Sequence, residues 1–463
     1  KHKGNILYQL KKSEYDENCP PKKMSLNILK NKQQSNMKIK LFTLCFLSII
    51  YTMGHAQEIE PAQKELTKKE KRKLKKEEPP HKGSVYFTPL PVISANPSFG
   101  FMYGVATSTS WYWGDPSTTN ISSMFAGVTL TTKGQTLITA KATAFSENND
   151  YKVDMDLRYL KSSQATYGLG SGPLQNRLAY QGFDLIHFNN QNAFSKPIDG
   201  AQLLEFNWAR TYLTVTKKIK SGVYAGIGYH LDAISNFKDN LLDTVSLPPV
   251  ITSFYAYNTK YGFSQLKNTL SGISLNGIYD TRDNVNATYK GRFAQLTYRI
   301  NPEFLGSDQN STSLWAEYRD YFDLTKDHKN MLAVWAFGSF QTSGNLPYMN
   351  LPGVGYDQYS SSGRGYTQGS IKGQSLTYTE IEYRRKLFGN EKNPDKWGIA
   401  VFANATTASN KDADIKLFKY IDPAFGVGIR YMVNPKSRTT LCLDYAIGSR
   451  KSSGIYLGLN EFF

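Results

Sequence analysis

The feature that most constrains this chain is a strict alternation of side chains that begins near residue 85. In VYAGIGYHLD, residues 223–232, Val223, Ile227 and Leu231 share one face of an extended segment, and Gly226 and Asp232 share the other. The same period of two recurs at 152–159, 425–431 and 440–448. Because a helix repeats every 3.6 residues, the pattern predicts β-strands whose two faces meet different surroundings.

The character of the two faces predicts a membrane barrel and not a soluble sandwich. Beyond one stretch near the N-terminus, no apolar run approaches the roughly 20 residues of a transmembrane helix. The chain holds 31 Tyr, 25 Phe and 36 Gly, which suits many strands with aromatic girdles. The polar faces often carry small or charged residues, which would line a lumen: Asp154, Asp156, Arg158, Arg430 and Asp444. We therefore expect an antiparallel β-barrel in the outer membrane of a Gram-negative bacterium, closed so that every backbone group is paired.

Alternation and turn signals together predict sixteen strands. They are expected near 99–112, 120–132, 135–146, 150–161, 164–171, 201–218, 222–232, 268–280, 292–301, 311–324, 329–340, 371–386, 396–404, 421–433, 438–448 and 453–463. Residues 85–93 also resemble a strand, but Pro89 and Pro91 lack the N–H groups of a paired strand. We interpret them as a lead-in to the barrel.

The lengths of the connections support this count. An even number of strands places both termini in the periplasm, and the four longest connections then fall on the outer side: 172–200, 233–267, 341–370 and 405–420. The inner side receives Thr132-Lys133-Gly134, Asn434-Pro435-Lys436 and the longer turns 281–291 and 387–395. Long outer loops and short periplasmic turns are typical of outer-membrane barrels.

The N-terminal part predicts export. Residues 37–56 combine a charged start, an apolar core from Leu41 to Tyr51, and small residues at Gly54 and Ala56, which is the pattern of a signal peptide. Residues 1–36 are polar and are interpreted as an extension outside the fold. Residues 57–84, 28 in all, are rich in Lys and Glu and are expected to form a charged periplasmic lead-in to the barrel at 85–463.

Net charge and reactive side chains exclude several other classes of function. The formal charge is +17, but part of it lies in the lysine-rich run 68–76 and no nucleic-acid module accompanies it, so no nucleic-acid partner is expected. The four histidines after residue 56 have no metal-ligand spacing. Neither a nucleophile motif nor a phosphate-binding glycine loop is present. The sequence therefore predicts no enzyme, no cofactor and no metal site.

The C-terminus has features of a signal for barrel assembly. The chain ends YLGLNEFF, with Tyr456, Gly458 and the terminal Phe463 at characteristic positions, although Glu461 stands where an apolar residue is usual. Ile455, Leu457, Leu459 and Phe463 are expected on one side of the last strand. The expected partners are outer-membrane lipid and, during biogenesis, the barrel-assembly machinery.

Two motifs make the chain resemble one barrel family. The first is Asp280-Thr281-Arg282-Asp283, at the predicted eighth turn and best explained by ion pairs within a periplasmic turn; the second is Gly363-Arg364-Gly365-Tyr366, inside the predicted loop 341–370. With the terminal pattern, they resemble the BamA/TamA superfamily, also called the bacterial surface antigen family, over about 85–463. The resemblance implies a sixteen-stranded barrel whose sixth outer loop, carrying this arginine motif, folds back into the lumen.

The resemblance also implies a partner for the loop arginine. In 376–385, alternation places Glu380, Glu382 and Arg384 on the lumen face, and Glu382 is the first choice as partner of Arg364. Arg430 and Asn404 are further lumen candidates, Gly363 and Gly365 would permit a tight turn, and Tyr366 would pack against the wall. The family often has Asp where this chain has Asn404, and a hydrophobic residue where it has Gly363.

Three functions remain open from the sequence. Family members that insert or export proteins carry periplasmic POTRA modules of several dozen residues, and none fits within residues 57–84. The first hypothesis is therefore a BamA-like barrel without POTRA modules that acts in outer-membrane protein or lipid assembly, with a protein partner in the periplasm or outer membrane. The alternatives are a passive or gated transport pore, which an open charged lumen would favour, and a structural surface protein.

Overall fold

The computed structural model describes residues 79–96, 100–173, 200–246, 249–325, 327–357, 360–391, 393–449 and 452–463. The predicted extension 1–36, the signal peptide 37–56 and most of the lead-in 57–84 lie outside these residues. Among the described residues, no helix is long and apolar enough to cross a membrane.

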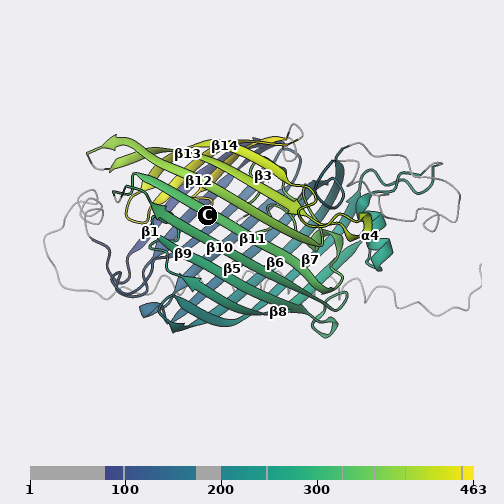
Figure 1. Cartoon of the computed structure of the whole chain (residues 1–463), viewed down its shortest axis with the longest axis horizontal. Coiled ribbons are helices and arrows are strands. Elements are labelled where there is room, and N and C mark those ends of the chain that lie inside the picture. Colours follow the sequence, from purple (N-terminus) through teal and green to yellow (C-terminus); the bar gives the residue numbers. More distant parts are fainter. Residues whose placement is uncertain are drawn as a thin grey trace, which may run out of the picture. The chain divides into compact units, whose positions relative to one another are not determined.

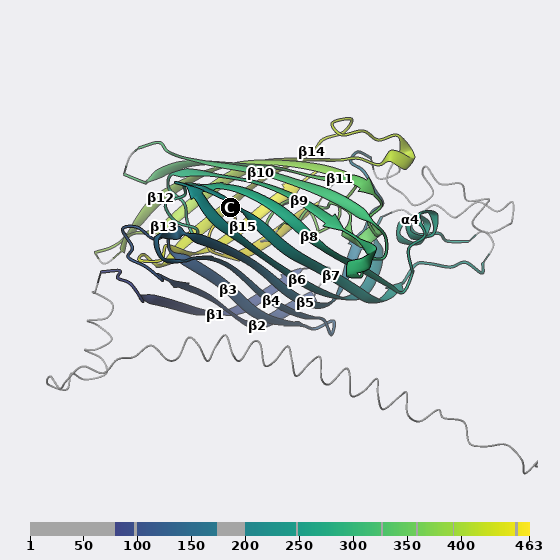
Figure 2. The same ribbon diagram turned by 90° about the horizontal axis from the view of Figure 1, so that it is seen from below.

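Sixteen strands form one antiparallel sheet in which every strand pairs with its neighbours in the sequence, and the sheet curls into a barrel (Figures 1 and 2). The strands are β1 (Val85–Asn96), β2 (Gly100–Trp111), β3 (Ser122–Thr131), β4 (Thr136–Phe145), β5 (Tyr151–Thr166), β6 (Gln202–Lys220), β7 (Val223–Asp239), β8 (Lys267–Asp280), β9 (Gly291–Asn301), β10 (Ser311–Asp323), β11 (Asn330–Gly344), β12 (Ser375–Asn390), β13 (Asn393–Ala408), β14 (Asp422–Asn434), β15 (Thr439–Gly448) and β16 (Ser453–Leu459). Within the described residues, the helical elements are α4 (Ser253–Tyr261) and the 3-10 turns η1 (Glu147–Asn149), η3 (Glu303–Leu305), η4 (Tyr348–Asn350) and η5 (Lys411–Ala413).

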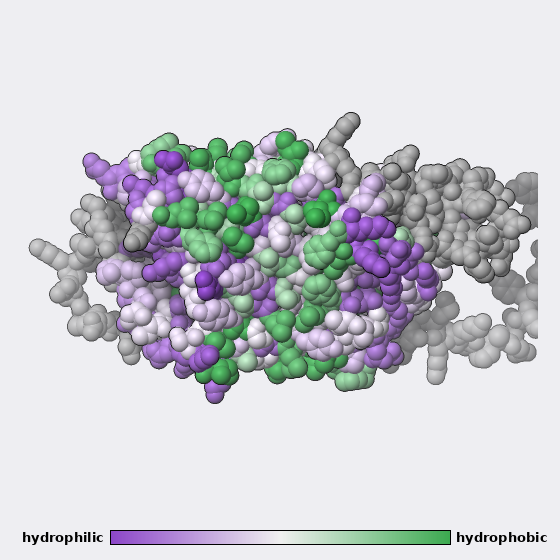
Figure 3. Space-filling model, viewed as in Figure 1, coloured by the Kyte–Doolittle hydropathy of each residue, from purple (hydrophilic) through white to green (hydrophobic). Residues whose placement is uncertain are grey.

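The alternation of the sequence becomes an alternation of exposure. On β14, Phe425, Val427 and Ile429 point outward and are 49–64% exposed, whereas Ala424 and Arg430 point into the barrel and are buried. Apolar residues gather over the middle of the strands, and hydrophilic residues lie toward both ends (Figure 3). The outside of the sheet is thus suited to hydrocarbon and the inside to polar contacts.

The predicted number of strands is confirmed, but two strand assignments were wrong and their errors cancel. Residues 85–93, interpreted as a lead-in, belong to β1, which pairs with β2 along its whole length. Pro89 and Pro91 are tolerated because β1 is an edge strand, and their missing N–H groups fit the side turned away from β2. The two strands predicted at 150–161 and 164–171 are one strand, β5, which continues through Ser162 and Ser163 in register with β6.

These corrections move some connections to the other end of the sheet. The long connections 167–201, 240–266, 345–374 and 409–421 all follow odd-numbered strands and share one end, here called the loop end. Thr132-Lys133-Gly134 follows β3 and therefore lies at the loop end, not on the inner side as predicted. The predicted turn 387–395 shrinks to 391–392, because β12 and β13 continue to Asn390 and from Asn393. The opposite end is called the turn end.

The expected closure is the main difference between prediction and structure. Among the described residues, ladders join each strand to the next from β1 to β16, but none joins β16 to β1. We call this gap the seam. At Asn460 the backbone turns to φ +70°, so the last residues leave the strand direction. Phe463, expected on the same side as Ile455, is instead buried inside, with its ring 5.3 Å from that of Trp335.

Candidate functional site

The connection between β11 and β12, residues 345–374 and called loop six from here on, folds into the lumen. Its two arms are joined by backbone bonds from Val354 N to Ile371 O, 3.0 Å, and from Gly369 N to Val354 O, 2.8 Å. Val354 and Ile371 are fully buried, and they pack with Tyr366 against the inner wall. A polar loop on a barrel surface would leave such residues exposed, so loop six is part of the interior.

The Arg364 cage consists of Arg364 and three carboxylates of the wall, Glu380, Glu382 and Asp444. The side chain of Arg364 is 1% exposed, and one of its terminal nitrogens donates to Glu380 and to Glu382, each at 2.5 Å. The other terminal nitrogen donates to Asp444 on β15. One planar guanidinium thus joins loop six to two strands that are separated by two others.

Two further arginines balance the charge of the cage. Arg384 donates to Glu382 at 2.5 Å and to the Phe463 carbonyl at 3.0 Å. Arg430 donates to Asp444 and to Glu461, the latter at 2.9 Å. Each buried carboxylate of the wall therefore faces at least one guanidinium, which offsets the cost of removing it from water. The predicted candidate Arg430 thus contacts the carboxylates that hold Arg364, and among the described residues its ion pairs are with the barrel and the C-terminal segment.

Asn404 lies where the family often has Asp, and its amide contributes a different bond. Its Nδ2 donates to the backbone carbonyl of Arg364 at 2.9 Å and lies 3.4 Å from Glu380. The ring of Phe402, on the same lumen face of β13, lies 3.5 Å from the Arg364 guanidinium carbon. The site thus holds the arginine by its backbone and by a cation–π contact as well as by charge.

The glycines of the motif permit its close fit. Gly363 and Gly365 have φ +77° and +105°, which L side chains rarely adopt. A Cβ at Gly365 would lie 2.7 Å from the Cβ of Ala424. Next to Gly365, the hydroxyl of Tyr366 donates to the Pro423 carbonyl of the wall at 2.6 Å.

The last strand also holds loop six. The Tyr456 hydroxyl accepts from Gly365 N at 2.8 Å and donates to the Tyr366 carbonyl at 3.1 Å. Gly458 pairs with Cys442 on β15, and a Cβ there would press on the ring of Phe462. The sequence predicts that Tyr456, Gly458 and Phe463 belong to an assembly signal. Whatever their part in assembly, the contact of Tyr456 with loop six was not expected from the sequence.

A second anchor lies on the opposite wall and is called the arginine wall, formed by Arg158 on β5 and Arg210 on β6. Arg158 donates to Ser360 Oγ at 2.6 Å and to the Asp357 carbonyl at 3.1 Å. Arg210 lies 3.5 Å from the Tyr356 carbonyl. Here the wall supplies the cations and loop six supplies oxygens. Asp156 neutralises Arg158 from the same strand, with N–O distances of 2.5 and 2.6 Å.

The motif at the turn end forms ion pairs within and between turns. Arg282 donates to Asp280 at 2.9 and 2.7 Å, and Lys152 lies 3.9 Å from the same carboxylate. Asp283 accepts from Arg438, in the β14–β15 turn, at 2.6 Å. Asp283 thus ties the turn at 281–290 to the turn at 435–438, whereas Asp280 and Arg282 pair with each other.

Several contacts escaped the sequence because they join distant residues. Asp444 was recognised as a lumen residue but not as a partner of Arg364, which lies 80 positions earlier. Of the arginine wall, the sequence predicts only Arg158 as a lumen residue and does not single out Arg210, since the backbone carbonyls that both contact carry no sequence signal.

Among the described residues, no group of three or more His, Cys, Asp or Glu side chains is arranged to hold a metal ion.

Comparison with known proteins gives one family match. A family model described as the Omp85 superfamily domain matches residues 103–463. A search of curated proteins found no match.

Solved structures of similar shape include BamA from Haemophilus ducreyi lacking POTRA domains 1–3, with a TM-score of 0.47 and 14% identity over 82% of this chain and 69% of that one. They also include CdiB from Acinetobacter baumannii, with a TM-score of 0.46 and 11% identity, and CdiB from Escherichia coli, with 0.46 and 9%. Each CdiB match covers 81% of this chain, which spans 59% and 60% of those two chains.

Proposed function

This chain belongs to the Omp85 superfamily of outer-membrane β-barrels, and we propose that it assists the assembly or translocation of proteins or lipids at the outer membrane. In this proposal loop six closes the lumen at rest, and the Arg364 cage holds it there. A partner in the periplasm or the outer membrane would deliver the substrate to the turn end.

The observation that carries the proposal is the burial of Arg364 among three wall carboxylates. A loop that only filled space would be held at least as well by apolar side chains, because a buried ion pair contributes little net stability once desolvation is counted. A charged anchor has another property. Its geometry is strict, so a small displacement of β12 relative to β15 weakens several bonds at once. Such a contact suits a loop that is released as the wall moves.

The seam supports the same proposal. β1 and β16 lack a ladder among the described residues, and the Tyr456 hydroxyl connects β16 directly to loop six. Movement at the seam therefore acts on the backbone of Gly365, next to Arg364. Ser361 of loop six adds a second link, because its hydroxyl donates to the Phe462 carbonyl at 2.8 Å.

Single-channel conductance in planar bilayers tests the proposal, with wild type compared with Arg364→Ala. We expect small, flickering currents from wild type and large, steady currents from the variant, because loop six loses its main anchor. Arg292→Ala is the matched control, since Arg292 is more than half exposed and lies near the turn end, and it should behave as wild type. A large wild-type current that Arg364→Ala leaves unchanged would contradict the closed lumen and favour a simple pore. Low currents in both proteins would show that the loop stays in place without the cage.

A further inference from the structure

A cavity of about 480 Å³ opens at the seam and does not belong to the Arg364 cage. It is lined by the inward faces of β1–β4, by β16 and the C-terminal residues 460–463, and by parts of the β8–β9 turn, β10, β15 and loop six. Its volume lies within the range of about 300–1,000 Å³ that small-molecule sites occupy. We call it the seam cavity.

The seam cavity is apolar at its open end. Val92 and Leu137 line it from β1 and β4, and Ile455 and Leu457 line it from β16. Ile455 is 62% exposed on the side that the membrane would cover, so the cavity reaches the outer surface of the sheet. Hydrocarbon could enter it from the bilayer without crossing water.

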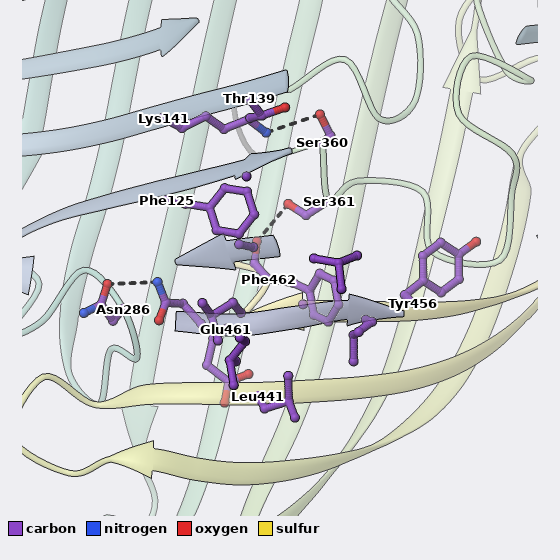
Figure 4. A pocket seen from close by; sticks show the side chains of 18 of the residues that line it. Phe125, Thr139, Lys141, Asn286, Ser360, Ser361, Leu441, Tyr456, Glu461 and Phe462 are labelled. Carbon is purple, nitrogen blue, oxygen red and sulfur yellow. Dashed lines mark hydrogen bonds between the residues drawn. The ribbon is translucent and has the colours of Figure 1, made fainter. Parts of the chain in front are cut away.

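The deep end holds a buried cation. Lys141 points from β4 toward Ser360 of loop six (Figure 4), and the distance from Nζ to Ser360 Oγ is 3.5 Å, the limit of a hydrogen bond. Lys141 is 7% exposed, and no ion pair within 4 Å is recorded for it among the described residues. Asp156 and Asp357 act on it electrostatically from farther away, but they accept bonds from Arg158 and from Ser362.

A neighbouring lysine shows that this arrangement is unusual in this barrel. Lys152, on β5, is also buried, but its ammonium lies 2.9 Å from Asp154 and 3.9 Å from Asp280. Lys141 has no such partner in the part of the chain that the structure describes, and a buried ammonium without an anion is costly. A ligand that brings an anion into the cavity would supply what the wall does not.

We propose that the seam cavity binds an anionic amphiphile with a single acyl chain, the chain along the apolar end and the carboxylate or phosphate at Lys141. An added β-strand is the competing occupant. It suits the β1 edge less well, because Pro89 and Pro91 remove two N–H donors from that edge. The inference rests on the proposed function in one respect, that the seam is where substrate meets the barrel.

The test uses a photoreactive palmitic acid, with its diazirine on the chain, and the full-length protein in phosphatidylcholine nanodiscs. Cross-links are mapped by mass spectrometry, and unlabelled palmitate or lysophosphatidate is added as competitor. We expect cross-links within 136–145 and 453–463, and about tenfold weaker competition by palmitate methyl ester, which has no anion for Lys141. Whichever competitor is stronger identifies the head group as carboxylate or phosphate.

Variants locate the site. Lys141→Met should weaken binding of the photoreactive acid by about tenfold, and Lys141→Arg should retain that binding. Leu137→Trp should abolish binding, because the indole fills the cavity. Lys133→Met, in the exposed β3–β4 turn, is the matched control and should have no effect. If Lys141→Met does not fold, the comparison of acid with ester on wild type and the Leu137→Trp variant still decide the question.

Equal competition by palmitate and by its methyl ester, or labelling unchanged by Lys141→Met, would overturn the proposal and leave only a lipid-covered seam. Displacement of the acid by a peptide with the β16 sequence, but not by palmitate, would assign the cavity to an added strand. None of these readouts requires conductance, so a failure here is distinct from a failure of the closed-lumen proposal.

Discussion

Loop six is held at both walls of the lumen, and the two walls hold it in opposite ways. At the Arg364 cage the loop supplies one cation and the wall supplies three carboxylates. At the arginine wall the barrel supplies the cations, and the loop supplies carbonyl and hydroxyl oxygens. The first anchor depends on the identity of one residue. The second depends mainly on backbone position, so many loop sequences could satisfy it. The difference predicts that the two anchors respond very differently to substitution.

The largest effect is expected at Arg364. Arg364→Leu leaves three buried carboxylates without their shared partner, and we expect a loss of about 3–5 kcal/mol in the free energy of unfolding. Arg364→Lys should recover only part of the lost stability, because an ammonium lacks the planar fork with which the guanidinium reaches both strands. Urea unfolding in lipid vesicles, followed by tryptophan fluorescence, measures both. If the lysine variant were as stable as wild type, charge alone and not geometry would explain the cage.

A smaller loss is expected at the other wall. Arg158→Ala removes the bonds to Ser360 and to the Asp357 carbonyl, but Asp156 keeps Arg210 at 3.7 Å, so no carboxylate is left without a cation. We expect a loss of about 1–3 kcal/mol in the free energy of unfolding, measured in the same experiment. Combined with Arg364→Leu, the two losses should add, since the anchors share no side chain. A loss at Arg158 as large as that at Arg364 would abolish the proposed difference between the anchors.

Tyr456→Phe sharpens the comparison, because it removes a neutral bond beside the charged cage. The variant loses the hydroxyl that joins Gly365 N to the Tyr366 carbonyl, and we expect a cost of about 1 kcal/mol. Protease cleavage within loop six should become faster if β16 helps to hold it. Tyr445→Phe is the control, because Tyr445 is on the outward face of β15 and its hydroxyl makes no contact with loop six that the structure records. Equal cleavage rates in both variants would mean that Tyr456 does not help to hold loop six in place.

The smallest expected effect is a pH dependence in the stability of the turn that precedes Ser360. Burial would raise the pKa of the Asp357 carboxyl, but bonds from the Ser362 hydroxyl and from the backbone of Ser361 and Ser362 outweigh burial and hold that pKa below its ordinary value. A depressed pKa in the folded state means that the stabilisation is complete above the unfolded value of about 3.9 and is lost as the pH falls through the folded value. Hydrogen exchange of residues 353–363, corrected for its intrinsic rate, should therefore rise below about pH 4 in wild type. In Asp357→Asn the rise should be absent.

How far the sequence predicts this molecule depends on the range of the contacts involved. Alternation is local, and it predicts the lumen faces that carry Glu380, Glu382 and Asp444, whereas the predicted number of strands is right only because two errors cancel. It failed at β1, where Pro89 and Pro91 were interpreted as excluding a strand although an edge accepts them. It also failed at β5, where Ser162 and Ser163 resemble a break but are paired with β6.

The site was predictable only where a motif marked it. Arg364 was found by its neighbours in the sequence, and the structure brings it against Glu382 together with Glu380. The contacts with Asp444 and Tyr456 join residues about eighty and ninety positions apart and depend on how the sheet curls. The lack of a ladder between β1 and β16 is likewise a property of the whole sheet, and no local pattern reveals it.

The span of the Arg364 cage also has a consequence for the order in which the barrel is built. The Arg364 cage is complete only when β12 and β15 are both in place, and the backbone of Gly365 is bonded only when Ser452 and Tyr456 are in place. Contacts so far apart in the chain form late, because the intervening segments must be ordered first. During biogenesis loop six would remain unattached on this side until the last hairpin is added. The lumen is then sealed by the final step of folding, and an unfinished barrel stays open.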